Sequence, residues 1–95
     1  MSARLLLSQK EVFADGAIVQ MTVWRLPAPL PPCVHSFKYS LFFGYPGHRL
    51  VGFDNERGKG DHRHGQDGEF AYDFISIEQL IADFNTWVRA IGGPR

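Results

Sequence analysis

The chain has 95 residues and a mass of 10.8 kDa, the size of one small domain covering residues 1–95. Ten Lys and Arg residues balance ten Asp and Glu residues, so the formal net charge is zero. This balance excludes a uniformly basic nucleic-acid coat protein and argues against an acidic disordered tail. Hydrophobic residues make up 44% of the chain, which is enough to build a core.

Cys33 is the single cysteine of the chain. One thiol excludes an internal disulfide and a zinc site built from several thiolates, and it makes a reducing cytoplasm the expected location. No motif surrounds Cys33, so we predict a non-catalytic thiol. The sequence shows no secretory signal and no apolar run near the ~20 residues that cross a bilayer, so no membrane association is expected.

Five segments have the composition of β-strands. Residues 5–13 and 17–26 flank Asp15-Gly16, a dipeptide favoured in tight hairpins because both positions tolerate positive φ. Residues 36–45 alternate apolar and polar side chains, and residues 49–53 follow the turn signal Pro46-Gly47. Residues 70–74 predict a short fifth strand. Between the second and third strands, four prolines predict an extended polyproline-like loop over residues 27–35, because proline cannot donate to a ladder.

The clearest predicted element is a C-terminal helix. Ser76 is the expected N-cap, Gln79 completes a capping box, and Gly92-Gly93-Pro94 ends the helix. Apolar residues at helical spacing form one stripe: Ile77, Leu80, Ile81, Phe84, Trp87, Val88 and Ile91. This stripe requires a sheet to cover it. We therefore predict an α+β fold, an antiparallel meander of four to five strands with one C-terminal helix packed on a sheet face.

Residues 54–68 hold no apolar side chain and concentrate histidine, basic and acidic residues around four glycines. His62 and His64 are two residues apart, so on an extended segment both point to one side and Arg63 points to the other. Imidazole titrates near pH ~6.5 and can both accept and donate protons at neutral pH. This segment is therefore the candidate functional site.

Three interpretations of the segment remain open. In the first, the two imidazoles act as general base and general acid on RNA, and Arg57, Lys59 or Arg63 steadies the phosphate. In the second, the imidazoles and a carboxylate of Asp54 or Asp61 bind zinc or iron. In the third, the segment is a solvated loop whose charges pair loosely.

Several motifs carry a family resemblance: Asp15-Gly16, Lys38-Tyr39, the polar stretch 53–64 and the helical stretch 77–84. Together they resemble the small TumE-type proteins of bacterial and archaeal toxin–antitoxin pairs, over residues 5–88. The distinctive part is an aromatic-Asp-Asn sequence followed by Asp-His-x-His. The positions that match this polar motif are Asp54, Asn55, Asp61, His62 and His64.

The resemblance implies a toxin encoded beside an antitoxin that carries a DNA-binding helix-turn-helix, and it suggests action on RNA. We predict a metal-independent endoribonuclease that uses no cofactor. Its expected catalytic residues are His62, His64, Asp61, Asp54 and Asn55, and its expected substrate-binding residues are Arg57, Lys59 and Arg63. Asp54 and Asp61 would orient an imidazole or cap the loop. With a neutral net charge, RNA binding must come from a local basic patch.

The alternative prediction is a non-enzymatic module that binds a protein or a nucleic acid. In that case the sheet edge or the helix docks a partner chain, and the polar segment is a specificity patch. An open meander leaves two unpaired edges, which also permits a homodimer.

Overall fold

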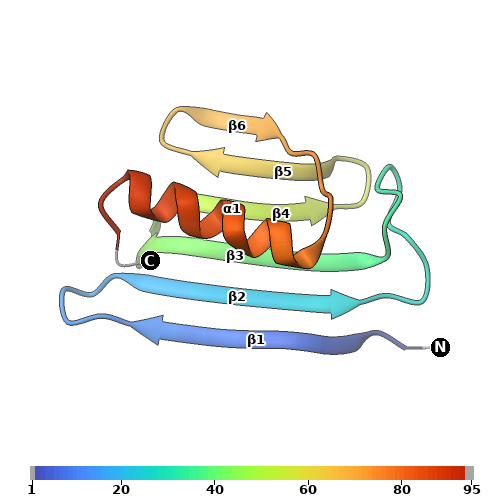
Figure 1. Cartoon of the computed structure of the whole chain (residues 1–95), viewed down its shortest axis with the longest axis horizontal. Coiled ribbons are helices and arrows are strands. Elements are labelled where there is room, and N and C mark those ends of the chain that lie inside the picture. Colours follow the sequence, from blue (N-terminus) through green and yellow to red (C-terminus); the bar gives the residue numbers. More distant parts are fainter. Residues whose placement is uncertain (1, 94–95) are drawn as a thin grey trace.

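The computed structural model describes residues 2–93. Its sheet has six antiparallel strands in chain order, and one helix lies across one sheet face (Figure 1). The strands are β1 (Arg4–Val12), β2 (Ile18–Arg25), β3 (Phe37–Tyr45), β4 (His48–Glu56), β5 (Gly60–Gly65) and β6 (Gly68–Ala71), and the helix is α1 (Ile77–Ala90). The α+β class, the antiparallel pairing and the C-terminal helix are confirmed. The predicted number of four to five strands is wrong.

The additional strand comes from the polar segment 54–68. β4 continues to Glu56 and β5 pairs with it from Gly60 onward, so most of this segment belongs to the sheet. Gly58 and Gly60 have φ values of +86° and +82° in the connecting turn, a backbone region that favours glycine. Hydrophobic alternation did not reveal β5, because its side chains on the uncovered sheet face are polar and its other positions are not aliphatic.

The core lies between α1 and one face of the central strands. Leu80, Phe84 and Val88 of the helical stripe are fully buried, whereas Trp87 and Ile91 lie at its margin with 38% and 39% exposure. They pack on the buried strand residues Val19, Met21, Val23, Tyr39, Leu41, Phe43, Val51 and Phe53. The predicted N-cap is confirmed, because Ser76 Oγ accepts a hydrogen bond from the Gln79 amide at 3.0 Å. The predicted capping box is not completed, because the Gln79 side chain donates to Asp83 Oδ1 at 2.7 Å. Each large apolar side chain buried here stabilises the fold by about 1.5–3 kcal/mol.

The sheet face opposite α1, called the open face below, is covered by no helix of residues 2–93. Strand pairing places Thr22, Ser40, Asp54 and His62 in one row across four strands. The row contains polar side chains because this face meets solvent. None of the described helices has the length and apolar character needed to cross a bilayer.

The segment between β2 and β3 contains no strand, as its prolines predict. It is not extended throughout, because the Cys33 amide donates to the Leu30 carbonyl at 2.7 Å and closes a turn. Its ends are joined by a 2.7 Å hydrogen bond from the Leu26 amide to the Ser36 carbonyl, and Pro31 accepts one from the Gly58 amide at 2.8 Å. This proline loop therefore docks on the β4–β5 turn. The contact places Cys33 and His35 beside the start of β5.

Candidate functional site

His62 and His64 lie side by side on the open face, where β5 presents both. Their ring centroids are 6.2 Å apart and their planes differ by 20°. Arg63 points to the other face, as strand alternation predicts. There its guanidinium lies 4.6 Å from the Phe70 ring centroid and 4.0 Å from that of Trp87. The structure thus brings the two imidazoles together and separates Arg63 from them.

Asp54 orients one of the two imidazoles. It lies opposite His62 on β4, and its Oδ1 is 3.0 Å from His64 Nε2. When Nε2 carries the hydrogen and donates it to this carboxylate, Nδ1 of His64 keeps a lone pair. A carboxylate placed in this way fixes the tautomer and stabilises the imidazolium that forms when the ring takes up a proton.

His62 has a different set of neighbours. Its Nε2 is 2.7 Å from the Lys59 carbonyl oxygen, which can only accept, so this nitrogen donates. Its Nδ1 is shielded from solvent and lies 3.0 Å from Glu69 Oε2, without the alignment of a hydrogen bond. The same Glu69 oxygen is 3.7 Å from His64 Nδ1. Both nitrogens of His62 therefore lie near oxygen atoms, one of Lys59 and one of Glu69.

Arg49 is a cation of the open face that the sequence analysis did not identify. A Cβ atom added to Gly52 would lie 2.7 Å from Arg49 Cδ and 3.2 Å from its Nε, so the arginine side chain crosses over this glycine. Gly52 is paired directly with His64. A glycine within a strand signals such a close approach. The register shift between Phe43 and Gly44 changes which residues share a face, and it cannot be read from the sequence.

The two other predicted phosphate ligands, Arg57 and Lys59, lie at the β4–β5 turn. Both are exposed, and Lys59 Nζ is 3.7 Å from Glu56 Oε2. An exposed pair of this kind contributes about 0–1 kcal/mol. Both cations therefore lie in the same hairpin as the imidazoles, and their charged groups are exposed to solvent.

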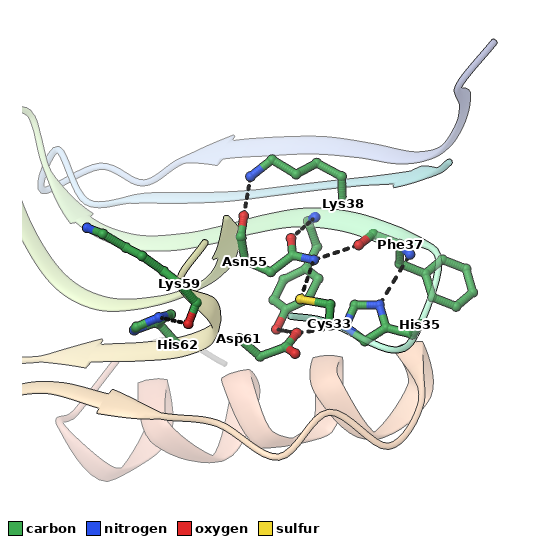
Figure 2. A network of polar contacts seen from close by, with 9 residues as sticks. Cys33, His35, Phe37, Lys38, Asn55, Lys59, Asp61 and His62 are labelled. Atoms are coloured by element: carbon green, nitrogen blue, oxygen red, sulfur yellow. Dashed lines mark hydrogen bonds and ion pairs between the residues drawn. The ribbon is translucent and has the colours of Figure 1, made fainter. Parts of the chain in front are cut away.

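Asn55 and Asp61 face α1 instead of the open face, and they join a buried network (Figure 2). Asn55 is fully buried; its Oδ1 accepts from the Tyr39 amide at 3.0 Å and its Nδ2 donates to the Phe37 carbonyl at 2.6 Å. Asp61 Oδ1 accepts from the Tyr39 hydroxyl at 2.6 Å and lies 2.8 Å from His35 Nε2. Lys38 donates to the Asn55 carbonyl. The network holds the proline loop, β3, β4 and β5 together.

Burial and hydrogen bonding control protonation in this network. Burial raises the pKa of the Tyr39 hydroxyl far above its usual value, and the hydrogen bond to Asp61 adds to the shift. Burial likewise raises the pKa of the Cys33 thiol. Both groups therefore stay protonated at neutral pH, so neither is an activated nucleophile.

The same network contains three side chains that could hold a metal ion: Cys33, His35 and Asp61, with ligand atoms within 4.8 Å of one another. A thiolate, an imidazole and a carboxylate would suit zinc. The hydrogen bonds of these residues do not suit a zinc ion, because His35 Nδ1 already accepts a hydrogen bond from the Phe37 amide at 3.2 Å. Its Nε2 must then carry a hydrogen, which it donates to Asp61, and a protonated nitrogen has no lone pair for a metal. The residues fit a hydrogen-bonded network and not a metal centre.

A comparison with protein families identifies the chain. The family model described as Toxin TumE matches residues 2–91. The chain belongs to the TumE family. Membership makes it a toxin of a toxin–antitoxin system, with an antitoxin as its partner, and confirms the resemblance seen in the sequence. No curated protein and no solved structure shows significant similarity to the chain.

The positions that resemble the TumE polar motif divide between the two faces of the sheet. Asp54, His62 and His64 lie on the open face, and Asn55 and Asp61 lie in the buried network. The sequence did not indicate which side chains contact each of these two groups. Glu69 and Arg49 for the open face, and His35 and Tyr39 for the network, come from other segments of this TumE chain.

Proposed function

We propose that this TumE-family toxin is an endoribonuclease that cleaves RNA on its open face without a metal ion. The observation that carries the proposal is the convergence of two imidazole nitrogens. Nδ1 of His62 and Nδ1 of His64 lie 3.0 Å and 3.7 Å from one Glu69 oxygen. A phosphate oxygen of RNA can take the place of that carboxylate oxygen between the two rings. Glu69 is 46% exposed on the edge strand β6, so its side chain has room to move aside.

His64 is the proposed general base and His62 the proposed general acid. Asp54 holds Nε2–H of His64 and leaves Nδ1 free to take the proton of the ribose 2′-hydroxyl. The 2′-oxygen then forms a bond to phosphorus and the bond from phosphorus to the 5′-oxygen breaks. His62 Nδ1–H gives its proton to that leaving oxygen. The products are a 2′,3′-cyclic phosphate and a 5′-hydroxyl end.

The phosphate charge needs a cation, and Arg49 is placed to supply it. Its guanidinium crosses Gly52, the residue paired with His64. Arginine binds phosphate oxygens through parallel N–H groups. Arg57 and Lys59 extend from the adjoining turn and would contact neighbouring phosphates. Arg63, included among the predicted phosphate ligands, is assigned here to holding β5 against α1 through Phe70 and Trp87.

Asn55 and Asp61 are proposed positioning residues. They are paired directly, one residue along from the Asp54–His62 pair on the same two strands. Their hydrogen bonds to Tyr39 of β3 and to His35 of the proline loop fix the backbone that carries Asp54 and His62. Their contribution to catalysis is thus through geometry and not through contact with RNA.

The test is cleavage of RNA by the purified protein in EDTA, with the chemistry of the new ends determined. We expect cleavage with 2′,3′-cyclic phosphate ends, and loss of about 10²–10⁴-fold in rate for each of His62→Ala and His64→Ala. His48→Ala, an exposed histidine at the β3–β4 turn, is the matched control and should cleave like the parent.

Full activity of the His62→Ala/His64→Ala variant would overturn the proposal, and so would cleavage that stops in EDTA. Growth inhibition without any RNA cleavage would instead support the non-enzymatic interaction module.

A further inference from the structure

Helix α1 and strand β1 begin at the same end of the molecule, where the proline loop also passes (Figure 1). An apolar groove is lined by residues from these three segments. Its volume is about 610 Å³, and it lies on the α1 side of the sheet. We call it the docking groove; its apolar lining includes Leu6, Val34, Phe37, Phe74 and Ile75. His62 and His64 do not line it, because they lie on the open face.

The rim of the docking groove exposes large apolar side chains to water. Val34 is 94% exposed, Ile75 is 76% exposed and Leu6 is 44% exposed. They come from three separate segments and meet at one groove, whereas single apolar residues scattered over a surface carry no such meaning. His35 and Phe74 also line the groove, and their stacked rings have centroids 3.9 Å apart. A preformed apolar groove of this kind fits an apolar partner segment.

Two arginines stand at the side of this groove. Arg4 and Arg25 are directly paired across β1 and β2, and like charges in that position repel. Arg25 lines the docking groove, and both arginines line the adjoining hollow of about 240 Å³. Over the part of the chain that the structure describes, neither guanidinium has a carboxylate partner. Glu78, at the first turn of α1, is the acidic residue of the lining.

We propose that the docking groove binds a segment of the antitoxin that combines apolar side chains with carboxylates. Membership of the TumE family indicates that the partner is an antitoxin. The apolar and basic side chains of the groove indicate that the bound segment is apolar and acidic. The apolar side chains of that segment would cover Val34 and Ile75, and a carboxylate between Arg4 and Arg25 would remove their repulsion. The groove and the imidazoles lie on opposite faces, so this inference does not depend on the ribonuclease activity.

The test measures affinity for the antitoxin encoded with this toxin, using the full-length purified chains. Val34→Glu/Ile75→Glu should weaken binding at least about tenfold, because these side chains would form the centre of the contact. Val12→Glu changes another exposed valine, 65% exposed at the far end of β1, and should bind like the parent. Arg25→Glu should weaken binding and reduce its dependence on salt, whereas Lys10→Glu on the same hairpin should do neither.

Growth assays provide the second measurement. Without antitoxin, Val34→Glu/Ile75→Glu should inhibit growth like the parent; with antitoxin, it should escape neutralisation. Parental affinity of this variant, or equal weakening by Val12→Glu, would overturn the proposal. Loss of growth inhibition in a folded variant would show that the groove serves the toxin's target. A dimer of the chain alone that this variant dissociates would show that a second copy fills the groove, and would also overturn it.

Discussion

Asn55 and Asp61 lie directly opposite each other on β4 and β5, and both side chains are held by Tyr39 of β3. Tyr39 uses its amide for Asn55 and its hydroxyl for Asp61. One residue along the same strands, Asp54 faces His62 on the other side of the sheet. Hydrogen bonds on the α1 side of the sheet therefore hold β4 and β5, the two strands that carry the proposed acid–base groups on the open face.

Removing the Asn55 side chain should destabilise the fold strongly. Asn55→Ala leaves the Tyr39 amide and the Phe37 carbonyl without partners inside the protein. A buried polar group left unpaired costs about 1–3 kcal/mol, so we expect the free energy of unfolding to fall by about 2–4 kcal/mol. Urea denaturation measures this change. Gln66→Ala, at an exposed turn, is the control and should stay within about 0.5 kcal/mol of the parent. A similar result for both variants would contradict the role assigned to Asn55.

Stability should decrease at alkaline pH because of Tyr39. Burial raises the pKa of Tyr39 in the folded chain, whereas the unfolded chain ionises it near pH ~10. The contribution of this pKa difference to the free energy of unfolding is therefore complete below pH ~10. It is lost as the pH rises further, by about 1.4 kcal/mol per pH unit. Urea midpoints measured at increasing pH should show a shallower alkaline decrease for Tyr39→Phe than for the parent. The exposed Tyr45, whose pKa is raised by its hydrogen bond to Asp15, provides the comparison: Tyr45→Phe should alter the slope less. Identical slopes for the parent and Tyr39→Phe would refute the assignment.

Asp54 should matter for the proposed RNA cleavage through His64. Asp54→Asn keeps the size of the side chain but removes the charge that stabilises the imidazolium of His64. We expect the rate at neutral pH to fall by more than about tenfold, with little change in KM. Asp67→Asn, an exposed carboxylate near Arg63, serves as the control. An unchanged rate for Asp54→Asn would remove Asp54 from the mechanism.

Substitution of Arg49 should impair RNA binding, whereas substitution of Arg63 should impair stability. Arg49→Ala should weaken RNA binding and lower cleavage, with little effect on stability, because its side chain is exposed. Arg63→Ala should lower the free energy of unfolding by about 1–2 kcal/mol through loss of two aromatic contacts. Gly52→Ala offers a further check, since its methyl group would displace the Arg49 side chain and should reproduce the Arg49→Ala defect. If Arg63→Ala alone lost RNA binding, the two assignments would be reversed.

Cys33 should behave as a buried thiol without metal. Burial raises the pKa of this thiol, so iodoacetamide at pH 8 should modify the folded chain far more slowly than the chain in urea. The Tm should be the same in EDTA and in excess Zn²⁺, because the hydrogens of His35 and Cys33 oppose ligation. A clear rise of Tm with Zn²⁺ would show that the network does hold a metal.

Local sequence signals predicted the regular elements of this chain because their causes are local. The capping residue Ser76, the apolar stripe of α1 and the turn at Asp15-Gly16 act over a few residues, and each is confirmed. The same signals failed for β5, whose segment contains no apolar residue to alternate with its charges. A strand can form there because the backbone hydrogen bonds to β4 and β6 do not require apolar side chains.

The sequence by itself determined that His62 and His64 share one side of an extended segment and that Arg63 takes the other, because strand alternation depends only on spacing. Only the tertiary structure decided which groups meet them. Glu69 approaches both imidazoles, Arg49 crosses Gly52 beside His64, and His35 and Tyr39 reach Asp61. These meetings arise from strand register and loop docking. Such long-range pairings depend on how the whole sheet assembles, and no local pattern of residues encodes them.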